Sequence, residues 1–269
     1  MKRLLIFGYG YTARALAIRL RAEGWEVRGT TRDGRDSLQW PGTDMTEHLD
    51  WASHLLISIA PRAEGDPVLN AYAEQLKSAK FDWVGYLSTT AVYGDHDGGW
   101  VDEDTPLTPA TQRGKWRVAA EEGWAEIDLP LHIFRLAGIY GPGRGPFAKV
   151  RAGTARRIVK PNQLFSRIHV DDIVRTLAAS IARPNPGQSY NVCDDEPAPP
   201  EDVLALAAEM LDLPAPPAED FATAEMTPMA RSFYAESKRV RNDRIKDELG
   251  VRLTYPTYRE GLAALLDES

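Results

Sequence analysis

The sequence predicts an α/β protein, in which a doubly wound parallel sheet is covered by helices on both faces and a small C-terminal lobe packs against it. Two observations predict this class. Apolar segments of strand length alternate with amphipathic helical segments as far as residue 193. Beyond residue 194, proline-rich turns interrupt the alternation, which is typical of a smaller appended lobe.

The alternation starts with a buried strand at 2–7, followed by a helix at 11–23 whose small and apolar residues recur at helical spacing. Gly24 ends this helix, because glycine readily takes the left-handed conformation found at helix C-termini. Asp171 is the expected N-cap of a later helix. The other segments of the sheet region are strands expected at 25–31, 54–59, 83–88, 131–137 and 189–193, and helices expected at 70–79, 113–127 and 172–182.

The glycine- and proline-rich segment 141–146 is expected to leave the sheet as a loop. We therefore expect two units: a sheet domain over 1–194, with a loop excursion at 142–165, and a small lobe over 195–269. Helices are expected in the lobe at 201–211 and 238–249.

Composition restricts the partners and the location of the protein. Its 32 basic and 39 acidic side chains give a net charge of −7, so there is no basic excess to attract nucleic acid or an anionic membrane. No apolar stretch approaches the roughly 18 residues of a membrane-spanning helix. The single cysteine, Cys193, excludes an internal disulfide and is expected in the core. These features predict a cytoplasmic protein that acts on a small molecule.

A glycine-rich turn, Gly8-Tyr9-Gly10-Tyr11-Thr12-Ala13, joins the first strand to the first helix. It fits the G-x-G-x-x-A dinucleotide fingerprint in the strand–turn–helix context that the fingerprint requires. Gly8 permits the tight turn, Gly10 leaves room for a pyrophosphate, and Ala13 allows close helix–sheet packing. The helix start, with Tyr11 and Thr12, offers its amides to the phosphates. The sequence therefore predicts a Rossmann domain that binds a nicotinamide dinucleotide; the alternative is a tight turn without a ligand.

The end of the second strand bears on the choice of cofactor. NAD-binding chains usually place an acidic residue there for the ribose 2′-hydroxyl, whereas this chain has Thr30, Thr31 and Arg32. A guanidinium suits a 2′-phosphate, so NADP is favoured over NAD. Two alternatives stay open: Asp33 could serve the NAD role if the strand ends later, and Arg32 could be a solvated turn charge.

Five motifs follow one another along most of the chain. They are the glycine turn at 8–13, LSTTAVYG at 87–94, RLAGIYGPG at 135–143, RIHVDD at 167–172 and YNV at 190–192. This order resembles the extended and atypical short-chain dehydrogenase/reductases, the NAD-dependent epimerase/dehydratase superfamily. The resemblance implies that Ser58 and Ala60 pass close to the adenosine half of the cofactor, and that Ala137 and Gly138 lie near the nicotinamide.

The resemblance also implies a hydroxyl that polarises the substrate carbonyl at the end of strand 83–88. Thr89, four residues before Tyr93, matches this position, and Ser88 is the neighbouring candidate. The alternative is that these hydroxyls only cap the strand end, as serine and threonine often do.

The family's acid is a tyrosine four residues before a lysine, whose charge lowers the pKa of the phenol. Lys115 stands in the matching segment, but Thr111 stands four residues before it, so the pair is broken. Lys115 is therefore either catalytic or an ordinary surface lysine. The proton donor would come from Tyr93, or from the carboxylates of Asp102 and Glu103 in the loop that follows.

Two arginines are candidates for binding an anionic part of the substrate. Arg167 precedes the His-Val-Asp-Asp run, and Arg144 lies in the glycine–proline loop. The alternative for each is a solvated charge. His169 and Asp171 lack the spacing of zinc ligands, so no metal site is predicted. Tyr258 is expected to pack the C-terminal lobe rather than line a substrate site.

Together these features predict an NAD(P)-binding domain over 1–194 and a substrate lobe over 195–269. The expected activity is that of an oxidoreductase or epimerase-like enzyme of the short-chain dehydrogenase/reductase type, acting on a small polar, nucleotide-sugar-like substrate. The alternative function is a non-catalytic regulatory protein that senses NADP, which the broken tyrosine–lysine pair favours. Helices of such folds often pair, so a homodimer is one expected assembly.

Overall fold

The computed structural model describes residues 2–267. The predicted sheet domain begins at Met1 and the predicted lobe ends at Ser269, so Met1, Glu268 and Ser269 lie outside the described residues. A seven-stranded sheet forms its centre, in the order β11-β7-β5-β4-β1-β2-β3, and every neighbouring pair is parallel. The strands are β1 (Arg3–Phe7), β2 (Glu26–Thr31), β3 (Leu38–Gln39), β4 (His54–Ile57), β5 (Trp83–Thr89), β7 (Leu131–Leu136) and β11 (Ser189–Val192). The predicted doubly wound fold is confirmed.

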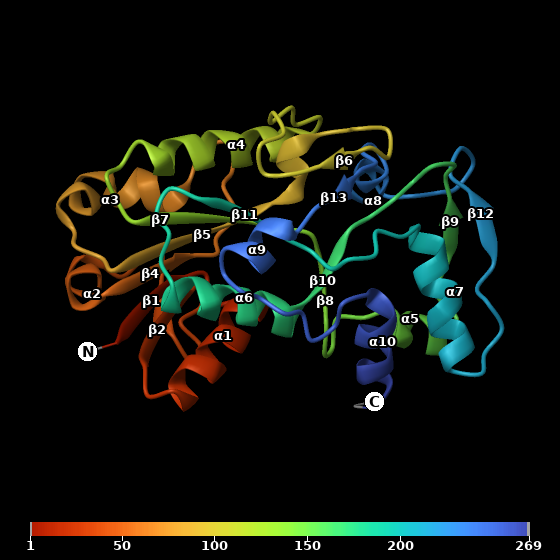
Figure 1. Cartoon of the computed structure of the whole chain (residues 1–269), viewed down its shortest axis with the longest axis horizontal. Coiled ribbons are helices and arrows are strands. Elements are labelled where there is room, and N and C mark those ends of the chain that lie inside the picture. Colours follow the sequence, from red (N-terminus) through yellow and green to blue (C-terminus); the bar gives the residue numbers. More distant parts are fainter. Residues whose placement is uncertain (1, 268–269) are drawn as a thin grey trace.

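Helices cover both faces of the sheet (Figure 1). One face carries α1 (Tyr11–Ala22) and α6 (Val170–Ala182), and the other carries α2 (Thr46–Trp51), α3 (Pro67–Ser78) and α4 (Gln112–Ala125). Burial on both faces explains why β1 is apolar after Arg3: Leu4 and Ile6 pack under α1, while Leu5 and Phe7 pack under α3. The strand order reverses between β1 and β4, where doubly wound sheets open the crevice that takes ligands.

A smaller layer of structure lies beyond the carboxyl ends of the strands, on the right in Figure 1. Its strands pair as β8 (Gly138–Tyr140) with β10 (Arg167–His169), and as β9 (Arg157–Val159) with β12 (Ala218–Asp220). Its helices are α5 (Phe147–Arg151), α7 (Pro200–Met210), α8 (Pro228–Phe233) and α10 (Tyr258–Asp267). The apolar core of this layer joins Tyr140 and Phe147 to Ala207, Tyr258 and Leu262.

The predicted boundary between residues 194 and 195 stays a prediction, and packing crosses it. Val240 and Ile245, from the C-terminal part, lie in the same core as α1 and α6. They belong to β13 (Arg239–Val240), which pairs with β6 (Trp100–Val101), and to α9 (Asp243–Asp247). The continuous helix expected at 238–249 is therefore wrong, because its first residues form a strand.

The expected N-cap of α6 is also wrong. The helix begins at Val170, and His169 caps it by accepting the amide of Asp171 at 3.2 Å. His169 is buried and extended, so its ring lies beside the first turn, whereas Asp171 is already helical.

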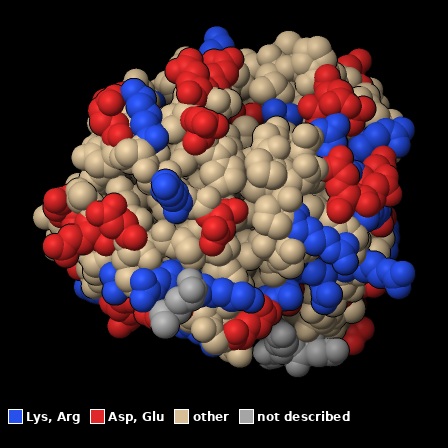
Figure 2. Space-filling view, turned by 60° about the vertical axis from the view of Figure 1, so that its left-hand side comes forward, with Lys and Arg blue, Asp and Glu red and all other residues tan. Residues whose placement is uncertain are grey.

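No helix within residues 2–267 is both long enough and apolar enough to cross a bilayer. On the face drawn in Figure 2, basic side chains form a broken band across the lower part, and acidic side chains gather in several groups, most of them above it. Cys193 is buried in the main core, as expected.

Candidate functional site

The first glycine of the turn holds β1 against β2. Gly8 has φ +93°, and a Cβ there would lie 2.8 Å from Cγ1 of Ile59. Its amide donates to the Thr30 hydroxyl at 3.1 Å. Only glycine combines this positive φ with such close neighbours. The turn after β1 is therefore held against the residues that follow β4 and against Thr30 of β2.

The second glycine faces open space. Gly10 is the N-cap of α1, where no side chain caps the helix, and a Cβ added to it would meet no protein atom within 4 Å. Thr12 and Ala13 are buried and seat the helix on the sheet. An uncapped helix start with space before it fits a pyrophosphate, because the helix offers both amides and the positive end of its dipole.

A neighbouring loop closes over the glycine turn. The Tyr11 hydroxyl donates to the Pro142 carbonyl at 3.0 Å. The Arg144 guanidinium lies 5.7 Å from the centre of the Tyr11 ring. The start of α1 and the glycine–proline loop therefore form one edge of the same crevice.

The end of β2 presents a basic rather than an acidic group. The Asp33 carboxylate accepts hydrogen bonds from the Thr31 hydroxyl at 2.9 Å and the Arg35 amide at 3.3 Å, which lower its pKa. It also pairs with the Arg35 side chain at 3.4 Å. Arg32 is exposed, and its side chain makes no hydrogen bond or ion pair with any described residue. Ser58 and Ala60 follow β4, the strand that pairs with β1. Ser58 is half-buried and Ala60 is exposed.

A buried polar cluster occupies the end of β5. Ser88 donates its hydroxyl to Glu121 of α4, and Glu121 forms an ion pair with Arg135 of β7 at 2.9 Å. Thr89, half-buried, accepts the Ala91 amide at 3.3 Å and caps the short helix η1 (Thr90–Tyr93). Ser88 is thus committed to a carboxylate inside the protein, which leaves Thr89 as the hydroxyl at the strand end.

Tyr93 belongs to this cluster, which corrects the expectation that it donates a proton. It is 0% exposed, donates to Asn191 at 2.7 Å and accepts from Arg135 at 2.9 Å. Burial raises the pKa of its phenol to about 12. A phenol that is enclosed and bonded on both sides cannot reach a substrate.

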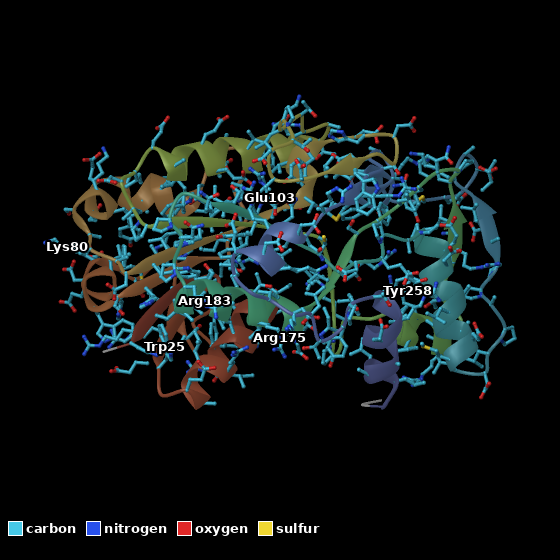
Figure 3. The ribbon with its side chains drawn as sticks, in the orientation of Figure 1. Trp25, Lys80, Glu103, Arg175, Arg183 and Tyr258 are labelled. Carbon is cyan, nitrogen blue, oxygen red and sulfur yellow. The ribbon has the colours of Figure 1, made fainter. Side chains whose placement is uncertain are left out.

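The two alternative carboxylates are also engaged. Glu103 accepts the Asn191 amide at 2.8 Å, and Figure 3 places it above the ends of β7 and β11. Burial raises the pKa of Glu103. Asp102 accepts the Thr105 hydroxyl at 2.8 Å within its own turn. Both therefore hold the loop that follows η1.

Helix α4 carries no tyrosine–lysine pair. Thr111 is its N-cap and accepts the Gly114 amide at 3.1 Å, while Lys115 is exposed. Arg117, which the sequence analysis passed over, instead reaches the Leu87 carbonyl and lies 3.3 Å from the Tyr86 hydroxyl. The signal for Arg117 was the helical spacing: it follows Lys115 by two residues, a rotation of about 200°, so it faces the strand while Lys115 faces away.

The two arginines predicted to bind an anion line one pocket of about 180 Å³. Arg167 pairs with Gly138 in the β8–β10 register, and its Cγ lies 3.7 Å from the position of a Cβ on Gly138. Ala137, just before, is buried. The other residues that matter for the pocket are Tyr140, Val203, Tyr258 and Leu262. Tyr258 lies between α10 and α7 in Figure 3, so it lines the pocket as well as packing the lobe.

Nothing in the described range points to a metal centre, since no three His, Cys, Asp or Glu side chains there are grouped to hold one.

The chain is similar in sequence or in structure to known proteins, three of which are described here. No family model matches the chain. Protein YeeZ of Escherichia coli K12 is 33% identical over 223 residues, which cover 72% of this chain and 78% of YeeZ. A functionally unknown conserved protein from Silicibacter pomeroyi is 61% identical, with a TM-score of 0.96 over 100% of this chain and 99% of that one. UDP-glucuronic acid 4-epimerase from Bacillus cereus, solved with NAD, shares the fold at a TM-score of 0.77 and 17% identity, over 98% and 97% of the two chains.

The buried ion pair generates a stability prediction. Arg135→Leu removes the partner of Glu121 and leaves a carboxylate buried, so we expect it to cost about 3–5 kcal/mol of unfolding free energy. Chemical denaturation at pH 7 measures this. The matched control is Lys77→Met, which breaks the exposed Lys77–Glu74 pair at 2.7 Å and should change stability by less than about 1 kcal/mol. Equal effects of the two variants would contradict the role given to Arg135.

Proposed function

We propose that this chain is an NADP-dependent oxidoreductase or epimerase of the NAD-dependent epimerase/dehydratase family that acts on a small polar substrate. One observation carries the proposal: the uncapped start of α1 at Gly10 faces open space at the point where the strand order reverses. That is where doubly wound folds bind the pyrophosphate of a dinucleotide.

The adenosine half of the cofactor would extend from Gly10 across Ser58 and Ala60 to the end of β2. The preference for NADP rests on Arg32. Its guanidinium is available for a 2′-phosphate, whereas Asp33 already accepts hydrogen bonds from Thr31 and Arg35. A free cation beside a satisfied carboxylate favours the phosphorylated ribose.

The nicotinamide half would extend toward Ala137 and Gly138, and when bound it supplies or accepts the hydride. Gly138 is exposed beside Arg167, and a Cβ on it would lie 3.3 Å from the Ser166 carbonyl oxygen and 3.7 Å from Cγ of Arg167. Thr89 ends β5, which pairs with β4 and so lies next but one to β1 across the switch point. Its hydroxyl is the one available to polarise a substrate oxygen. Arg144 and Arg167 would hold an anionic part of the substrate.

A non-catalytic protein that senses NADP is the second candidate. The observation in its favour is that Tyr93 and Glu103 are both buried and hydrogen-bonded, and Thr111 caps a helix. None of these groups is placed to replace the family's tyrosine. Oxidation of NADPH, followed at its absorbance with a panel of aldehydes, ketones and sugars, separates the two functions.

The cofactor preference is tested by titration calorimetry with NADPH and NADH. We expect the parent protein to bind NADPH more tightly, and Arg32→Ala to narrow the difference by about 1–3 kcal/mol, because it removes charge-assisted hydrogen bonds. Arg35→Ala is the matched control, since Arg35 already pairs with Asp33, and it should change the difference less. Equal affinities in the parent protein would refute the preference.

The pyrophosphate site is tested by Gly10→Val. The added side chain meets no protein atom within 4 Å of its Cβ, so the variant should fold with near-parental thermal stability. Its methyl groups would occupy the space assigned to the pyrophosphate, so NADPH binding should fall by at least about tenfold. Parental affinity in the folded variant would show that the dinucleotide binds elsewhere.

Once a substrate is in hand, two threonines discriminate the proposed roles. Thr89→Val should lower kcat by about 10²-fold, the effect of losing one positioned donor in the transition state. Thr111→Val should keep most of the rate and cost about 1 kcal/mol of stability, because this residue caps a helix. An inactive Thr111→Val with an active Thr89→Val would place the chemistry on α4 instead.

A further inference from the structure

The pocket between β8, β10, α7 and α10 contains a half-buried cation, Arg167, that forms no ion pair with any described residue. Arg167 donates through Nη1 to the carbonyls of Phe165 at 2.9 Å and Ala198 at 3.0 Å. Within residues 2–267 it makes no ion pair, and its Nε and Nη2 have no hydrogen-bond partner. Desolvation lowers the pKa of the guanidinium, and the nearby Asp194 carboxyl offsets part of this effect.

The pocket around Arg167 is otherwise mainly apolar. Val203 and Leu262 line it together with the rings of Tyr140 and Tyr258, and Arg144 adds a second cation from the exposed glycine–proline loop. The Tyr140 hydroxyl is buried and has no hydrogen-bond partner in the described part of the chain. An apolar pocket with two guanidinium groups and an unused phenol suits an acid with a compact apolar body.

The size of the pocket restricts the acid. Its volume of about 180 Å³ lies below the roughly 300–1,000 Å³ of pockets that enclose drug-sized ligands. A nucleotide sugar exceeds this space, whereas a carboxylic acid with a single ring or a short chain fits it.

We propose that this pocket binds the carboxylate of a small organic acid between Arg144 and Arg167, and that such an acid is the substrate. That the acid is a substrate, and not only a ligand, rests on the proposed function: Arg167 pairs with Gly138, beside which the nicotinamide is expected. It replaces the nucleotide-sugar class with a smaller one. Planar carboxylates match the two parallel donors of a guanidinium, which gives the pocket its selectivity.

A neighbouring carboxyl adds a pH signature. Asp194 is 1% exposed, its amide donates to the Arg167 carbonyl at 2.7 Å, and its Oδ2 has no partner in the described residues. Burial raises the pKa of Asp194 to about 8, so it is mostly neutral at pH 7 and leaves the charge of Arg167 uncompensated. The other charged or titratable groups that act on this pair are Asp195, Glu196, Glu201, Tyr140, Tyr234 and Tyr258.

The sign of the pH effect follows from that pKa. Above about pH 8, Asp194 ionises and its negative charge compensates Arg167, so an anionic ligand should bind more weakly. Asp194→Asn cannot ionise, and its affinity for the ligand should stay level between pH 7 and 9.5.

The test is calorimetry of the full chain, without cofactor, using benzoate and its neutral analogue benzamide as probes. We expect benzoate to bind and benzamide not to, with Arg167→Gln and Arg144→Gln each losing about tenfold or more in benzoate affinity. Arg252→Gln, an exposed arginine outside the pocket, is the matched control and should bind as the parent does. Thermal unfolding checks that Arg167→Gln is folded; Arg144 is exposed, so its variant gives a result independent of folding.

Three outcomes would overturn the proposal: equal binding of benzoate and benzamide, benzoate binding that both arginine variants retain, or Arg167-dependent binding of UDP-glucose or inorganic phosphate without benzoate binding. Failure of the proposed function is distinguished by titrating NADPH in parallel. A protein that binds benzoate through Arg167 but binds no dinucleotide refutes the cofactor role and keeps the acid site. A protein that binds NADPH but fails the benzoate test loses only the acid site.

Discussion

The guanidinium of Arg135 holds together the sheet edge on which the site is built. From near the carboxyl end of β7 it pairs with Glu121 of α4, donates to the Tyr93 hydroxyl at the end of η1, and donates to the Glu103 carbonyl at 3.3 Å. Glu121 in turn accepts the Ser88 hydroxyl of β5. A charge buried this deeply is tolerated only when its partners are in place, so helix, strand end and loop must adopt one arrangement together.

That arrangement has a chemical consequence. The Ser88 hydroxyl and the Glu121 carboxylate serve the buried cluster, and the Tyr93 phenol is bonded to Asn191 and Arg135, which leaves the Thr89 hydroxyl at the edge. In the pocket beside β8, Arg167 is half-buried next to Gly138 and forms no ion pair with a described residue. In the proposed function, the site would combine a dinucleotide crevice of ordinary construction with a substrate pocket selected by charge. Its proton chemistry must differ from that of relatives with the tyrosine–lysine pair.

The fold could be predicted from the sequence because the signals that indicate it are local. An apolar run such as residues 3–7 needs cover on both faces, and Gly8 and Gly10 combine a forced turn with an open helix start, all within ten residues. Sequence reasoning failed where a residue's role depends on distant partners. The fate of Tyr93 is decided by Asn191 and Arg135, and no spacing in the sequence reveals that these meet. Likewise, Arg144 and Arg167 were candidates singly, and only the packing of the lobe brings them into one pocket.

A crystal structure of the protein with NADP tests the central claim most directly, because the claim joins two places on one crevice. The account predicts that the pyrophosphate lies against Gly10 at the start of α1, that the 2′-phosphate contacts Arg32, and that the nicotinamide reaches Gly138 beside Arg167. A dinucleotide bound away from Gly10, or a nicotinamide directed away from Gly138 and the arginine pocket, would contradict it.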